Sequence, residues 1–256
     1  MTANPVAVSE WTLREERLER AIERVAALGY DGFELAGRPE RPVGGVAQAL
    51  AAAGLRATSV CTVWSEARDY AHPDAGPRRA AVEYLRACLA WGGELGVGAV
   101  VVVPTYRTEP LAARADELAR AAESIAAALD GHPAGGPRVA IEPLNLYETS
   151  LVRTLADAEE LRAAVGHPAA GLLADVFHMN IEERSIPDAL ASHAEHLVHV
   201  HLADSNRAEP GAGHIDFDGA AAALRAAGYA GAMAMEFLPW SDEAGARGLA
   251  RIRAAF

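Results

Sequence analysis

The chain has 256 residues, of which 51% are hydrophobic, with a formal charge of −12 and two cysteines. This size and composition suffice for one large core, while the negative charge disfavours nucleic acid as a partner. Two cysteines within apolar segments argue against a disulfide framework, and no signal peptide or apolar run of about 18 residues is present. We therefore expect a soluble, cytoplasmic protein that binds neither nucleic acid nor membrane.

Eight short apolar or β-branched runs follow one another at near-even spacing, and each predicts a strand. They occupy residues 5–9, 31–37, 56–63, 98–106, 138–145, 171–177, 197–205 and 231–238. Segments with helical periodicity separate them, and several end on glycine, as helices often do, for example 13–29, 79–96 and 218–228. This alternation predicts an α/β fold, a single (β/α)₈ TIM barrel that forms one domain over residues 1–256.

An open, doubly wound sheet is the main alternative architecture. The turn after the first run carries no Gly-rich phosphate fingerprint, and strand-like runs continue to the C-terminus. Both observations favour the closed barrel.

Four consecutive predicted strands carry a potential metal ligand at or near their C-terminal end: Glu142, Asp175, His201 and Glu236. Because these strand ends converge on one mouth of a barrel, we expect the four side chains to meet. Three carboxylates at one point repel one another unless a cation lies among them. The set predicts one divalent metal ion, with Mn²⁺ as the first expectation, Mg²⁺ or Co²⁺ as close alternatives and Zn²⁺ left open.

Other polar and aromatic residues near the strand ends allow two interpretations each. Trp64 and Tyr106 follow the third and fourth strands and either line a sugar pocket or form an ordinary aromatic rim. Glu34 either reaches the mouth or pairs with Arg38. His199 shares the face of His201 one layer deeper, which predicts an interior, hydrogen-bonded histidine rather than a ligand.

The segments IEPLNLYE (141–148), DVFHMNIEE (175–183), HVHLADSNR (199–207) and AMEF (234–237) resemble the xylose isomerase-like TIM-barrel superfamily. The resemblance is strongest to its ketose 3-epimerases (D-tagatose and D-psicose 3-epimerases) and hydroxypyruvate isomerases. It implies the same four metal ligands, the two glutamates as an acid/base pair, and assembly as a homodimer or homotetramer. It further implies that three residues contact substrate oxygens: Glu148, His178 and Arg207. Leu146 departs from the family, in which arginine is frequent at this position.

The resemblance implies a divalent-metal-dependent epimerase or isomerase of a ketose or related keto sugar. In this hypothesis Glu142 and Glu236 exchange a proton with the sugar through a cis-enediolate that the metal stabilises. A lyase or dehydratase that eliminates a β-leaving group from the same enediolate is the main alternative. An apurinic endonuclease and a non-catalytic barrel are less favoured, because only His72 supplies an imidazole in the first half and the ligand set is intact.

Overall fold

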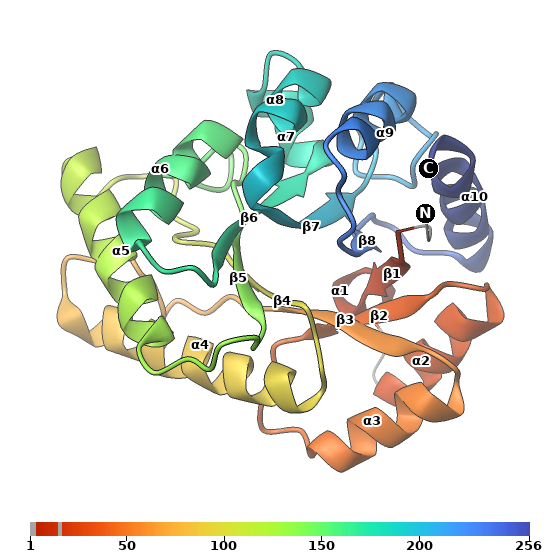
Figure 1. The fold of residues 1–256 in the computed structure, drawn as a ribbon, viewed down its shortest axis with the longest axis horizontal. Helices are drawn as coiled ribbons and strands as arrows, with labels where there is room; N and C mark the ends of the chain where they lie inside the picture. The colour runs from red at the N-terminus through yellow and green to blue at the C-terminus, as the bar shows by residue number, and fades with distance from the viewer. Residues whose placement is uncertain (1–3, 15–16) are drawn as a thin grey trace.

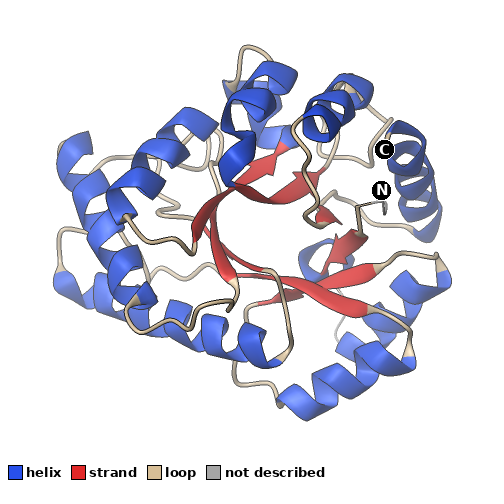
Figure 2. Cartoon of the chain, viewed as in Figure 1, coloured by secondary structure: helices blue, strands red, loops and turns tan. Residues whose placement is uncertain are grey.

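The computed structural model describes residues 4–14 and 17–256. Within these residues eight parallel strands close into a barrel in the order β1 to β8, and helices form a ring outside it (Figures 1 and 2). β8 pairs with β1, with Ala234 opposite Ala7, which closes the sheet. The predicted TIM barrel is confirmed. The strands are β1 (Val6–Ser9), β2 (Gly32–Ala36), β3 (Arg56–Cys61), β4 (Ala99–Val102), β5 (Arg138–Ile141), β6 (Ala170–Asp175), β7 (Leu197–Leu202) and β8 (Met233–Met235).

The helices of the described residues cover the outer face of the barrel. They are α1 (Glu10–Leu13), α2 (Leu18–Ala27), α3 (Val43–Ala52), α4 (Ala75–Glu94), α5 (Arg114–Leu129), α6 (Leu155–Val165), α7 (Val176–Glu182), α8 (Ile186–His193), the 3₁₀ helix η1 (Ala194–His196), α9 (Phe217–Ala226) and α10 (Asp242–Ala255). Among the described parts of the chain, no helix combines the length and apolarity needed to cross a bilayer.

Alternation along the strands separates two apolar regions. In β4, Val100 and Val102 belong to the large core between the strands and the surrounding helices, whereas Ala99 and Val101 belong to a small cluster with Cys61, Ala140 and Leu173. Because successive strand side chains point to opposite faces, the small cluster fills the barrel interior. Polar side chains further along the same inward-facing rows therefore lie at the mouth.

The helix expected over residues 13–29 is interrupted. α1 ends at Leu13, since its C-cap residue Arg14 has a φ of 50°, in the left-handed region, and α2 begins at Leu18. Residues 15 and 16 of the expected helix lie outside the described residues. Since α1 follows β1 without a loop, it carries Trp11 and Thr12 to the C-terminal mouth of the barrel.

Candidate active site

The structure brings together the four residues that were predicted as metal ligands. Asp175 is the last residue of β6, His201 lies in β7, and Glu142 and Glu236 directly follow β5 and β8. One ligand atom from each of the four lies within 4.8 Å of the others. Three of the side chains are almost fully buried, with exposed fractions of 5% for Glu142 and 0% for Asp175 and His201, while Glu236 retains 15%.

His201 lies at the centre of this group. Its Nδ1 atom is 3.2 Å from Glu142 Oε1 and 3.0 Å from Glu236 Oε2. The two glutamates come from strands that are separated by two others in barrel order. They therefore approach the same imidazole nitrogen from different sides of the mouth.

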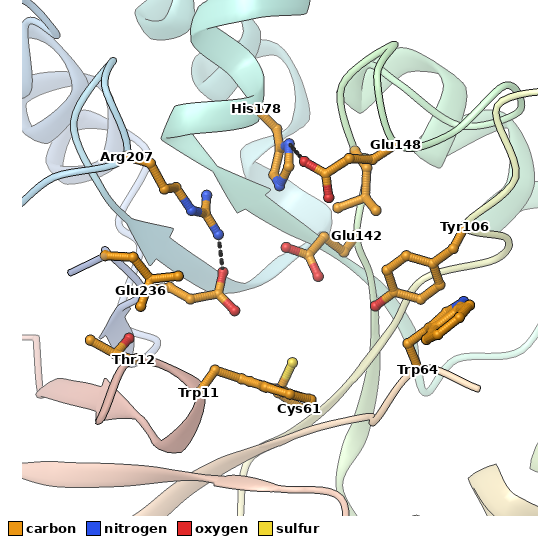
Figure 3. A pocket seen from close by; sticks show the side chains of 12 residues that line it. Trp11, Thr12, Cys61, Trp64, Tyr106, Glu142, Glu148, His178, Arg207 and Glu236 are labelled. Carbon is orange, nitrogen blue, oxygen red and sulfur yellow. Dashed lines mark hydrogen bonds and ion pairs between the residues drawn. The ribbon is translucent and has the colours of Figure 1, made fainter. Parts of the chain in front are cut away.

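Arg207 lies across the remaining part of the cluster. Its Nη1 atom donates to Asp175 Oδ2 at 2.7 Å. Its Nη2 atom donates to Glu236 Oε2, also at 2.7 Å (Figure 3). The backbone of Arg207 has a φ of 61°, and the buried Asp204 organises its loop, because the Asp204 carbonyl accepts the Arg207 N–H. The face of the Phe177 ring lies 4.6 Å from the guanidinium carbon. The guanidinium is thus held in one position against two carboxylates.

Burial and neighbouring charges shift the pKa values of this cluster in opposite directions. Burial is the main cause that raises the pKa of Glu142 to about 7. The negative charges of Glu236 and Asp175 raise this pKa further, whereas His201 lowers it. Asp175 is equally buried, yet the positive charge of Arg207 holds its pKa below the usual range. Burial lowers the pKa of His201, but the surrounding carboxylates outweigh it and raise that pKa well above its ordinary value.

The predicted substrate contacts also converge on the mouth. Glu148 and His178 line the same cavity as Arg207. The backbone N–H of Asn145 donates to His178 Nδ1 at 3.1 Å, and the Asn145 side-chain amide donates to Glu148 Oε1 at 3.0 Å. Because Nδ1 accepts a hydrogen bond and burial lowers the pKa of His178, the neutral ring carries its proton on Nε2. Asn145, which was not predicted from the sequence, fixes this orientation.

A cavity of about 280 Å³ lies over the cluster. Trp11, Trp64 and Tyr106 form an aromatic side of it, with the rings of Trp64 and Tyr106 edge to face at 6.3 Å (Figure 3). Trp64 is 51% exposed, which is unusual for so large an apolar side chain and is typical of a ligand-binding rim. The first of the two interpretations of Trp64 and Tyr106, as cavity-lining residues, is the one observed. Five further residues that line the cavity were not predicted from the sequence: Trp11, Thr12, Cys61, Leu144 and Leu238.

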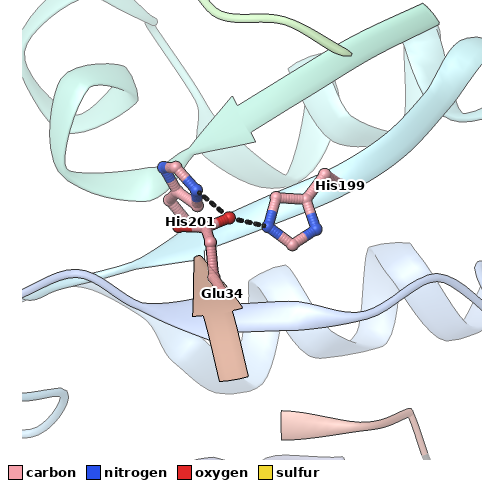
Figure 4. A group of neighbouring side chains, drawn as sticks. All are labelled: Glu34, His199 and His201. Carbon is pink, nitrogen blue, oxygen red and sulfur yellow. Dashed lines mark hydrogen bonds and ion pairs between the residues drawn. The ribbon is translucent and has the colours of Figure 1, made fainter. Parts of the chain in front are cut away.

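Glu34 lies beneath the cluster rather than pairing with Arg38. It is fully buried, and its Oε2 atom accepts a hydrogen bond from Ser59 Oγ at 2.7 Å. The same atom accepts from His199 Nε2 at 2.8 Å and from His201 Nε2 at 3.1 Å (Figure 4). His199 is therefore an interior, hydrogen-bonded histidine, as predicted.

The chemistry of these residues fits a divalent cation. Arg207 pairs with two carboxylates, Asp175 and Glu236, while Glu34, Glu142 and Glu236 contact the imidazole of His201. Four carboxylates thus share one guanidinium and one imidazole, so acidic groups outnumber basic ones at this centre. Glu142, Asp175, His201 and Glu236 offer three carboxylate oxygens and one imidazole nitrogen, a set typical of Mn²⁺, Mg²⁺ or Co²⁺ sites.

Comparison with known proteins identifies the family. Residues 22–254 match the family model described as xylose isomerase-like TIM barrel. The chain is 29% identical over 238 residues to 3-dehydro-D-guloside 4-epimerase of Escherichia coli (strain K12), covering 86% of this chain and 87% of that protein. It is 28% identical over 224 residues to D-psicose 3-epimerase of Agrobacterium fabrum, and this match covers 84% of this chain and 77% of that protein.

The fold agrees with these relatives. A crystal structure of D-psicose 3-epimerase in the presence of D-fructose superposes with a TM-score of 0.90 over 98% of this chain and 99% of that chain, at 24% identity. As the sequence motifs predicted, the chain belongs to the xylose isomerase-like TIM barrel family.

Proposed function

We propose that the protein is a divalent-metal-dependent epimerase or isomerase that acts on a keto sugar. We call Glu142, Asp175, His201 and Glu236 the four-donor cluster. The observation that carries this proposal is that two of its members, Glu142 and Glu236, also line the cavity. The enzyme class predicted from the sequence, a sugar isomerase or epimerase, is confirmed by the relatives named above.

A divalent cation held by Glu142, Asp175, His201 and Glu236 would polarise a sugar carbonyl and acidify the neighbouring C–H group. Glu142 and Glu236 reach the cavity from β5 and β8. One carboxylate can take the α proton from one face of the sugar while the other returns a proton to the opposite face. This exchange inverts one carbon, whereas return of the proton to the adjacent carbon interconverts a ketose and an aldose.

Three further side chains supply complementary hydrogen-bonding groups to a polyhydroxylated ligand. Arg207 and the Nε2–H of His178 are donors, and Glu148 is an acceptor on the same wall of the cavity. The aromatic side formed by Trp11, Trp64 and Tyr106 suits the apolar C–H faces of a sugar and reduces the water around the reacting carbon.

The four donors Glu142, Asp175, His201 and Glu236 supply three carboxylates and one imidazole. Among the metals, Mn²⁺ is the first candidate for this oxygen-rich set, followed by Mg²⁺, Co²⁺ and Zn²⁺.

Substitution of the two glutamates tests the proton exchange. Glu142→Gln and Glu236→Gln should each abolish turnover while a metal still binds at reduced affinity, because Gln retains the shape but removes the base. Glu159→Gln, in which the altered carboxylate pairs with Arg162 on the outer helix α6, should remain active. Activity retained in both cavity variants would overturn the assignment.

Proton exchange in deuterated water tests the reaction class without knowledge of the true substrate. The Mn²⁺-loaded protein is incubated with a panel of ketoses and 3-keto glycosides, and α-deuterium incorporation is followed by NMR. We expect exchange at the carbon next to the carbonyl, together with an epimer or aldose product. A dehydrated product, or no exchange with any member of the panel, would contradict the proposed reaction.

A further inference from the structure

The imidazole of His201 has carboxylate oxygens at both ring nitrogens. Nδ1 faces Glu142 and Glu236 in the cluster, whereas Nε2 faces Glu34 Oε2, which comes from β2 on another side of the barrel (Figure 4). Both His201 and Glu34 have exposed fractions of 0%. The ring is therefore oriented entirely by protein groups.

The hydrogen bond to Glu34 determines which nitrogen can bind a cation. A neutral imidazole carries one N–H and one lone pair, and a carboxylate only accepts. When Nε2–H donates to Glu34, the lone pair is on Nδ1 and points at the site where three carboxylates meet. In the metal-free protein a second proton on Nδ1 satisfies the two carboxylate oxygens about 3 Å away, and a cation that binds among the carboxylates would take the place of that proton.

Glu34 is itself fixed by groups that the four-donor cluster does not use. Its Oε2 atom also accepts from Ser59 in β3 and from His199 in β7. Both donors lie at irregularities in strand pairing. Phe33 pairs with Ala57 but Glu34 pairs with Ser59, and Leu172 pairs with Leu197 but Leu173 pairs with His199.

Each irregularity leaves one extra residue, Thr58 in β3 and Val198 in β7. Such shifts re-aim the side chains that follow them and are common beside active sites. Here they bring two donors from different strands to a single carboxylate oxygen.

We infer that Glu34 is a positioning residue, which holds His201 with its Nδ1 lone pair toward the cation and raises the affinity of the site through that contact. The inference rests on the proposed metal-dependent function. A carboxylate that accepts from the far nitrogen of a ligating histidine both orients the ring and increases its basicity, and its loss typically weakens metal binding 10- to 100-fold.

Titration of the metal-free protein with Mn²⁺ tests the inference by a readout that does not depend on turnover. Glu34→Gln should raise the Kd by about 10- to 100-fold, because a neutral amide accepts more weakly and can also present its NH₂ group to Nε2. Ser59→Ala, which leaves the Glu34 charge and its contact with His201 in place, should change the Kd by less than about threefold. Binding by Glu34→Gln with wild-type affinity would overturn the inference.

A second pair of variants separates positioning from simple loss of a buried charge. Glu117 is also buried, and its carboxylate pairs with Arg107 rather than with the cluster. Glu117→Gln should lower stability but leave the Kd unchanged, and an equal loss of affinity in this variant would contradict a specific role for Glu34. Glu34→Asp keeps the charge but shortens its reach, so it should also bind weakly, and it serves as the test if Glu34→Gln does not fold.

The wild-type titration distinguishes failure of the inference from failure of the proposed function. If the wild-type protein binds no divalent ion, or if Asp175→Asn binds as tightly as wild type, the proposed metal site is wrong. If wild type binds and Asp175→Asn does not, an unchanged Kd in both Glu34 variants removes only the positioning role. Co²⁺ provides an independent signature, since its visible absorption should change in Glu34→Gln when the His201 ring reorients.

Discussion

Glu142 is a buried carboxylate whose ionisation the metal-free protein disfavours. Its pKa of about 7, raised mainly by burial, compares with an ordinary value of 4.5 for a glutamate. Between these two pH values Glu142 holds more protons in the folded protein than in the unfolded chain. The contribution of Glu142 to the free energy of unfolding therefore falls as pH rises through this window. This contribution is greatest below about pH 4.5 and is lost by about pH 7.

We therefore predict that metal-free wild type loses up to about 3 kcal/mol of stability relative to Glu142→Gln between about pH 4.5 and 7. Burial lowers the pKa of His178, and this shift affects stability with the opposite sign. The effect of His178 largely cancels when the free energies of unfolding of wild type and Glu142→Gln are subtracted, since His178 is present in both. Urea unfolding in the presence of a chelator at several pH values provides the measurement, and a pH-independent difference would contradict the prediction.

The four-donor cluster was predictable from sequence because each member lies at or near the end of an apolar run, and spacing of about one βα unit places such ends together. Glu34 lies within a similar run, but its partner His199 is 165 residues away and is brought to it by irregular strand pairing that no local pattern encodes. Trp11 was missed because its position depends on α1 following β1 without a loop. Local signals thus identified the cluster and the interior position of His199, but not the contact between His199 and Glu34.

At the level of elements, all eight predicted strands are present, and most of the predicted ranges extend beyond the C-terminal ends of the observed strands. The fourth was expected over residues 98–106, whereas β4 ends at Val102. Apolar residues continue past the strand because they line the mouth or pack beneath the loops, and hydrophobicity alone does not distinguish these positions from the strand itself. Strand order and closure followed from the alternation with helices.

Gly171 in β6 allows β7 to approach closely at one of the two irregularities. A Cβ atom at this position would lie 2.7 Å from Val198 Cγ1 and 2.9 Å from the His196 carbonyl oxygen. We predict that Gly171→Ala destabilises the protein by about 1–3 kcal/mol, because the Val198 side chain and the His196 carbonyl just before β7 must move. The change should appear as a lower urea midpoint with an unchanged m value.

Gly44 provides a matched control. It is exposed in α3, and a Cβ atom added there would have no other atom within 4 Å, so Gly44→Ala should stabilise the protein by about 0.5–1 kcal/mol. If Gly171→Ala were as stable as wild type, the close approach of β7 to β6 would not constrain the barrel.

For the whole molecule, the net charge of −12 is combined with extensive pairing of arginines to acids. Examples on different elements are Arg24–Asp242, Arg41–Glu10, Arg107–Asp69, Arg114–Asp157, Arg162–Glu159, Arg247–Glu209 and Arg251–Asp218. Such pairing leaves little positive potential for a phosphate backbone. We predict no saturable binding of a labelled abasic duplex at physiological salt by fluorescence anisotropy, and micromolar binding would reopen a nuclease role.

Stability of the whole barrel should respond to the cation, because the four donors come from β5 to β8 and a bound ion links these strands. At a free concentration of about 1,000 times the Kd, an ion that binds only the folded protein stabilises it by about 4 kcal/mol. For a chain of this size the gain corresponds to a rise in Tm of roughly 10 °C. Calorimetry of the chelator-treated protein with added MnCl₂ gives the measurement.

Asp175→Asn is the control for that rise, because the amide is similar in shape but lacks the charge of a fully buried donor. We expect its Tm to change by less than about 2 °C under the same conditions, whatever its starting value. An equal rise in wild type and Asp175→Asn would place the stabilising ion elsewhere on an acidic surface. No rise in either would mean that the three carboxylates are balanced by Arg207 and protonation alone, without a metal ion.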